Sequence, residues 1–207
     1  MKRILVIFSI AALAGIYSCK TDKTKTTEVK KERVIAKKTD AQVKADLDSL
    51  SREMDRTWNE MIASDDQKID NLQTLLARIG RDKNYDKAAL TKVISARDSM
   101  KQQRYDRQGL ANVAAVDAYD SLQIKIMDAT NELVQNTNLA ERDTVAASLV
   151  NQIQEDDSRV PILRAYYDKA AKHFNQYLKD YQPQIQKLGP PYSDLKPVPM
   201  FVEQPVM

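Results

Sequence analysis

The 207-residue sequence contains little of what most catalytic sites are built from: one cysteine, one histidine and four glycines. The single histidine, His173, follows a lysine on a polar flank, and the sequence supplies no partner for it in proton transfer or metal binding. The isolated glycines form no glycine-rich phosphate-binding loop. One cysteine excludes a disulfide within the chain. We therefore expect no enzymatic activity.

The chain also lacks a charge excess and a long apolar run. Its formal net charge of +3 is too small for the basic face that nucleic-acid binding needs. Its longest apolar run, Ile4–Ile16, falls short of the roughly 20 residues that cross a bilayer. Scarce glycine, together with abundant Ala, Leu, Lys, Gln and Arg, favours long helices over strands.

That apolar run follows Lys2 and Arg3 and ends shortly before the only cysteine. A basic start, an apolar centre and a short polar end are typical of a secretory signal peptide, which we assign to residues 1–18. Ile16-Tyr17-Ser18-Cys19 is similar to a bacterial lipobox, in which the cysteine is lipidated and becomes the first mature residue. The alternative is a short uncleaved anchor with an incidental thiol.

Residues 19–38 are expected to be a lipidated basic tether. From residue 20 onward this stretch holds eight cations against three carboxylates and has too little apolar surface to fold. It would reach about 25 Å as a flexible chain. Two interpretations stay open, since the cations either lie against anionic lipid headgroups or belong to a plain solvated spacer.

Four amphipathic segments follow, with apolar residues recurring at three- and four-residue steps: residues 40–79, from 87 to before Gly109, 112–135 and 139–181. Asp40, Asp86 and Asn138 are candidate N-caps, and Gly80 suits a left-handed position after the first helix.

These segments predict an all-α fold, an elongated antiparallel four-helix bundle over residues 39–182 with two long helices. Pro161 should kink the last helix, because its ring removes a donor and crowds the preceding turn. Residues 183–207 are rich in proline and should form an extended tail that either folds back on the bundle or binds a partner.

Charged residues gather near the middle of both long segments: Asp65, Asp66, Lys68 and Asp70 on one, and Asp156, Asp157 and Arg159 on the other. Antiparallel packing with matched midpoints would bring Asp65 level with Asp156. We interpret the group as a salt-bridge layer that fixes helix register. The alternative is a carboxylate metal site, but dimetal bundles need a Glu-x-x-His pair that this chain lacks. We therefore expect no metal and no cofactor.

Aromatic residues concentrate toward the C-terminus. Most are expected to pack in the bundle, but a partner-binding groove is a second interpretation. Four residues are candidates for that role: Tyr166, Tyr177, Tyr192 and Phe201.

Several motifs lie in the C-terminal part of the chain: Arg159-Val160, the run Arg164-Ala165-Tyr166-Tyr167-Asp168-Lys169-Ala170, Phe174-Asn175 and Lys196-Pro197-Val198-Pro199-Met200-Phe201. They resemble motifs of the LemA family of envelope-anchored helical proteins, and the last is similar to the family's ending. The resemblance also includes Trp58 and Asp70 and spans residues 50–203. It implies a helical bundle at the cell envelope and carries no established enzymatic activity. The residues to which it gives a structural role are Trp58, Asp70, Arg159, Arg164, Tyr167, Asp168, Phe174 and Asn175.

Together these features favour a non-catalytic lipoprotein that is held on the membrane through Cys19 and presents its bundle to an envelope protein. A carrier or sensor that binds a metal or a lipid inside the bundle is the alternative. Because Lys20 is not the aspartate that marks inner-membrane retention in well-studied bacteria, we expect the outer membrane, facing the periplasm. No nucleic-acid partner is expected.

The lipobox assignment is directly testable by intact-mass analysis of protein from bacterial membranes. We expect a mass that lacks Met1–Ser18 and includes added acyl groups on Cys19, because the signal sequence ends there. A mass that retains residues 1–18 would contradict the assignment.

Overall fold

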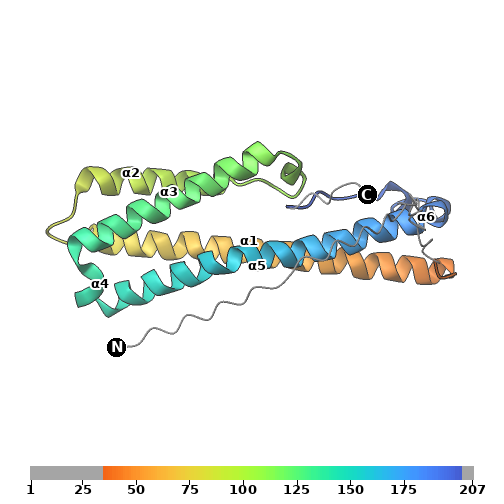
Figure 1. The fold of residues 1–207 in the computed structure, drawn as a ribbon, viewed down its shortest axis with the longest axis horizontal. Coiled ribbons are helices and arrows are strands. Elements are labelled where there is room, and N and C mark those ends of the chain that lie inside the picture. Colours follow the sequence, from red (N-terminus) through yellow and green to blue (C-terminus); the bar gives the residue numbers. More distant parts are fainter. Residues whose placement is uncertain (1–34, 202–207) are drawn as a thin grey trace, which may run out of the picture. The chain divides into compact units, whose positions relative to one another are not determined.

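The computed structural model describes residues 35–201 (Figure 1). The predicted signal peptide, Cys19 and most of the predicted tether lie outside the described residues, as do residues 202–207. The described part is all-helical and contains no strand. None of its helices combines the length and the hydropathy needed to cross a membrane.

The first long helix, α1, spans Asp40–Ile79 and begins at a capping box. Thr39, rather than the predicted Asp40, is its N-cap: its side chain accepts from the Gln42 N–H at 3.2 Å, and the Gln42 side chain accepts from the Thr39 N–H at 2.8 Å. Two orphan N–H groups are thus satisfied reciprocally. The predicted left-handed Gly80 is wrong, since its φ is −65° and its N–H still bonds to the Leu76 carbonyl.

Helices α2 and α3 span Lys87–Gln103 and Val113–Thr137, and the short 3₁₀ helix η1, Gln108–Ala111, lies between them. Asp86 caps α2 as predicted, by accepting from the Ala89 N–H at 2.9 Å. Asn138 stands at the N-cap position of the next helix, as predicted, but its side chain makes no capping hydrogen bond there. It ends α3 in the left-handed conformation, with φ of 49°.

The predicted single helix over residues 139–181 is divided into α4, Leu139–Arg142, and α5, Thr144–Asp180. The division falls at Asp143, whose carboxylate accepts from the N–H groups of Val145 and Ala146 and so begins a new helix. Pro161 lies inside α5 without ending it.

The extended tail predicted from residue 183 is wrong at its start. Helix α6 covers Gln182–Leu188, with Pro183 in its first turn, where a missing N–H removes no helical hydrogen bond. A 3₁₀ turn, η2, follows at Tyr192–Asp194. Residues 195–201 then run without regular secondary structure, and we call them the strap.

Helices α1 and α5 pack antiparallel. Tyr177 donates to Asp46 near one end at 2.8 Å, and Arg78 pairs with Asp143 near the other. Helices α2 and α3 lie beside the C-terminal half of α1 (Figure 1). One apolar cluster joins these four helices there. A second cluster joins the N-terminal half of α1 to α5 and α6, with partly buried strap residues packed against it.

Trp58 lies in this second cluster and tests its packing. Its side chain is 9% exposed, and its ring meets that of Tyr167 edge-on with centroids 5.2 Å apart. We expect Trp58→Ala to lower the free energy of unfolding by about 3–5 kcal/mol, because the ring's burial is lost and a cavity is left.

Tyr166→Ala is the matched control, since that ring is 54% exposed. It should change stability by less than about 0.5 kcal/mol. Urea unfolding followed by circular dichroism measures both variants. Equal effects from the two substitutions would show that the second cluster does not depend on Trp58.

Candidate functional site

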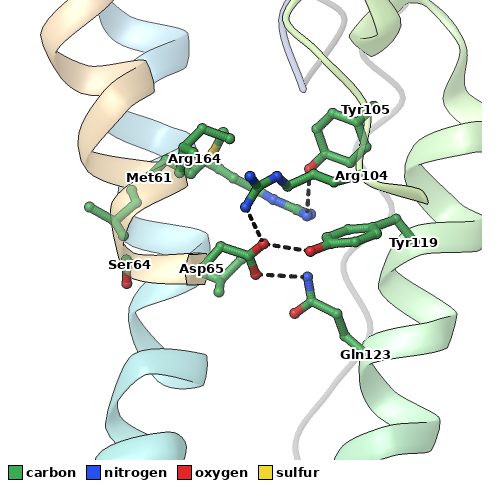
Figure 2. Close-up of a pocket in the computed structure, with 11 residues that line it drawn as sticks. Met61, Ser64, Asp65, Arg104, Tyr105, Tyr119, Gln123 and Arg164 are labelled. Atoms are coloured by element: carbon green, nitrogen blue, oxygen red, sulfur yellow. Dashed lines mark hydrogen bonds and ion pairs between the residues drawn. The ribbon is translucent and has the colours of Figure 1, made fainter. Parts of the chain in front are cut away.

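A polar cluster lies in the middle of α1, where it faces α2, α3 and α5. We define it as Asp65 and Lys68 of α1, Arg104 after α2, Tyr119 and Gln123 of α3, and Asp157 of α5. Figure 2 shows the part of it around Asp65, with side chains converging from α1 and α3. It is the most polar part of the described interior.

Asp65 accepts hydrogen bonds from three side chains. Arg104 Nη1 donates at 3.0 Å, Tyr119 Oη at 2.5 Å and Gln123 Nε2 at 3.1 Å (Figure 2). The Asp65 side chain is only 10% exposed, so these donors stand in for water.

Lys68 brings a positive charge into the interior with a side chain that is 1% exposed. Its Nζ donates to the Gln123 side-chain oxygen and to Asp157 Oδ1, the latter at 3.0 Å, and lies 3.9 Å from Asp65 Oδ1. Gln123 therefore links the cation to the anion, because its amide accepts from one and donates to the other. Removing either charge would take one buried ion-pair partner from the other, although Lys68 keeps Asp157 and Asp65 keeps Arg104.

The same contacts set the protonation states around Asp65. Burial raises the pKa of the Tyr119 hydroxyl, and the nearby Asp65 anion raises it further, so Tyr119 stays a neutral donor. Burial also raises the pKa of Tyr105 to about 12. Burial opposes the charge of Arg104, but its bonds to Asp65 and Asp66 outweigh that effect and raise its pKa.

The predicted charged layer is only partly present. Lys68 meets Asp157, whereas Asp156 bonds to Asn71 at 3.4 Å and so does not come level with Asp65. Asp66 pairs with Arg104 at 2.9 Å. Asp70 and Arg159 are exposed, with Asp70 3.5 Å from Lys101.

Three members of the polar cluster were missed from the sequence: Arg104, Tyr119 and Gln123. Tyr119 and Gln123 are four residues apart and therefore share one face of α3. A tyrosine and an amide on one helix face were the available indication that this face meets polar groups. Arg104 follows the end of α2, where the helical periodicity no longer indicates which way a side chain points.

A small cavity of about 20 Å³ adjoins the cluster, lined among others by Ser64, Arg104 and Arg164. The described residues contain no group of three His, Cys, Asp or Glu side chains placed to hold one metal ion. His173 is exposed, as the sequence predicted.

Several residues of the LemA-like motif hold the strap. The Asn175 side chain donates to the Val198 carbonyl at 2.7 Å and accepts from the Val198 N–H at 2.8 Å. Tyr167 Oη donates to the Pro199 carbonyl at 3.0 Å, and the Phe201 N–H donates to Asp168 Oδ1 at 2.8 Å. All four bonds go to the strap backbone, so the motif fixes its path.

The remaining motif residues have other surroundings. Arg164 forms a two-fold ion pair with Asp120, with distances of 2.6 and 2.7 Å, and its guanidinium lies 4.6 Å from the centre of the Phe201 ring. Phe174 is buried in the same cluster as Trp58.

The four candidate partner-binding aromatics differ in exposure. Tyr166 is exposed, whereas Tyr177 bonds to Asp46 and stacks on Tyr181 with ring centroids 4.5 Å apart. Tyr192 donates to Asp48 at 3.2 Å. Phe201 packs edge-on against Tyr105 and Tyr167, with both centroid distances 6.0 Å.

A scan against models of protein families and searches of curated proteins and of solved structures match nothing. The resemblance to the LemA family therefore stays a prediction that rests on the motifs quoted above.

The polar cluster predicts a difference between two aspartates of α1. Asp65→Ala should lower the free energy of unfolding by about 3–5 kcal/mol, because Arg104 and Lys68 lose a buried counter-ion. Asp70→Ala, the same change at a side chain that is 63% exposed, should cost less than about 1 kcal/mol.

Urea unfolding of both variants at neutral pH measures this difference. If Asp65→Ala unfolds at the same urea concentration as Asp70→Ala, the cluster does not stabilise the packing of the helices.

Proposed function

We propose that this chain is a non-catalytic bacterial envelope lipoprotein of LemA-like type, which presents its helices as a scaffold or partner-binding module. In this proposal the lipidated Cys19 holds it on the outer membrane, facing the periplasm, and an envelope protein is its partner. Its fold in finer terms is an elongated antiparallel four-helix bundle with two long helices and a proline-rich C-terminal tail.

One observation carries the non-catalytic part of the proposal: the charged side chains of the polar cluster bind one another and their neighbours. The buried Asp65 carboxylate has three donors, and the buried Lys68 ammonium bonds to Gln123 and Asp157. A general base or a nucleophile must reach its substrate, whereas the Asp65 and Lys68 side chains are buried and bound to neighbouring side chains. Groups bound in this way serve the packing of helices better than they serve a reaction.

The arrangement of helices supports the proposed bundle. Helices α1 and α5 run antiparallel along their lengths, and α2 and α3 pack beside the half of α1 that holds the polar cluster. The proline-rich tail would begin after α6 and include the strap, which bonds to α5 through Asn175 and Asp168.

Localisation and partner binding are tested together in bacteria that express the full chain. After membrane fractionation, wild-type protein should sediment with the outer membrane, and a short crosslinker should capture a defined envelope protein. Cys19→Ser should move to the soluble periplasmic fraction because no lipid attaches. Lys20→Asp should instead move to the inner membrane.

Cys19→Ser protein that stays with the membrane would overturn the anchor, and wild-type protein that yields no crosslinked envelope protein would overturn the scaffold role. Lys20→Asp protein that stays in the outer membrane would remove the basis for the sorting assignment.

A further inference from the structure

Three segments that are far apart in the sequence enclose a groove of about 1020 Å³. One wall is the end of η1 and the start of α3, with Val113 and Val116. A second wall is the turn of α5 around Pro161 and Ala165, and the third is the end of the strap, with Phe201. The walls are mainly apolar, and we call this site the strap groove.

Apolar side chains in and beside the strap groove remain open to solvent. Val113 is 60% exposed on its wall, and Pro161 and Ala165 are exposed on the α5 wall. Clustered apolar exposure of this kind marks interaction sites more often than scattered single residues do. A partner that covers this face would bury these groups.

The charged groups of the strap groove favour a partner with a positive charge. Its lining contains three carboxylates, Asp117, Asp120 and Asp168, and one guanidinium, Arg164. Arg164 is already bound to Asp120 and lies over Phe201. Asp117 is exposed and has no hydrogen bond or ion pair with another described residue. The exposed Asp117 carboxylate therefore favours a cation over an anion at this wall of the groove.

The strap wall depends on a residue outside the groove lining. Asn175 binds the Val198 backbone through both its amide groups, and Val198 begins the part of the strap that lines the groove. Asn175 is thus a positioning residue, because it would act on a bound partner only by keeping the strap in place.

We propose that the strap groove is the docking site for a peptide segment of a partner protein, a segment with apolar side chains and at least one lysine or arginine that pairs with Asp117. This inference rests on the proposed function and names the chemistry of the partner. The apolar side chains would cover Val113 and the Pro161 turn, and the cation would lie at the rim.

The test uses the purified full chain in detergent and a displayed library of random peptides of about 12 residues, long enough to fill an interface groove. We expect enriched peptides that combine Leu, Phe or Trp with Lys or Arg. A synthetic copy of an enriched peptide then gives a dissociation constant by fluorescence anisotropy. Enrichment of acidic peptides, or no enrichment, overturns the proposal.

Asp117→Lys should weaken binding of that synthetic peptide by about tenfold or more, since attraction becomes repulsion at the rim. Asp128→Lys is the matched control, because it makes the same charge change on the exposed surface of α3, outside the groove lining. It should change binding by less than about twofold. Asn175→Ala should also weaken binding while Asp117 is intact, and its melting temperature reports whether the helices still fold.

Equal effects of the two lysine substitutions would overturn the docking site. If the chain instead dimerises with rising concentration in light scattering, and Ala165→Arg abolishes the dimer, the occupant is a second copy and the proposal is wrong. Membrane fractionation and crosslinking test the lipoprotein proposal without these peptides. If the wild-type chain is anchored and crosslinked but Asp117→Lys does not weaken peptide binding, only the groove proposal is refuted.

Discussion

The buried ammonium of Lys68 is the constraint on which the arrangement of the helices depends. A cation that is 1% exposed needs acceptors within the protein, and α1 alone offers it only Asp65 at 3.9 Å. Gln123 of α3 and Asp157 of α5 supply the other oxygens. Both helices must therefore meet α1 at the level of Lys68, and this fixes their register. Apolar packing by itself tolerates a shift of one turn more readily than such a network does.

The apolar side chains of α1 are buried by different elements in its two halves. Its C-terminal half is covered by α2, α3 and the start of α5, which together enclose an apolar cluster. At its N-terminal half, the described residues of α5, η1 and α6 form a second cluster with α1, and the partly buried strap packs against that cluster. The motif residues Tyr167, Asp168 and Asn175 bind the strap backbone there. Holding the strap thus extends the core and also builds one wall of the groove.

Much of the helical framework follows from local pattern. The stripe of α1 and the cap at Asp86 were predictable because apolar spacing and caps act within a few residues. The break between α4 and α5 at Asp143 was missed, because the spacing of apolar residues continues unchanged past this single capping residue. Helix α6 was missed because proline was interpreted as extended chain, although it also suits the first turn of a helix.

The candidate site was less predictable than the framework. Asp65, Lys68 and Asp157 were expected to share one layer, and they do. Tyr119, Gln123 and Arg104 were absent from that expectation, because the periodicity of α2 and α3 does not say which face meets α1. Helix lengths gave a register that paired Asp65 with Asp156, but Asp156 bonds to Asn71 instead.

The sequence by itself determined that the described chain is helical, where most of its helices begin, and that charged residues lie amid their apolar stripes. These properties depend on spacing, capping and composition within a few turns. Only the tertiary structure decided which partners bury Lys68, which side chains hold the strap and where the groove opens. Those outcomes depend on contacts between residues far apart in the sequence, such as Lys68 and Asp157, which are 89 positions apart. The geometry of these contacts is set by the packing of whole helices rather than by any local pattern.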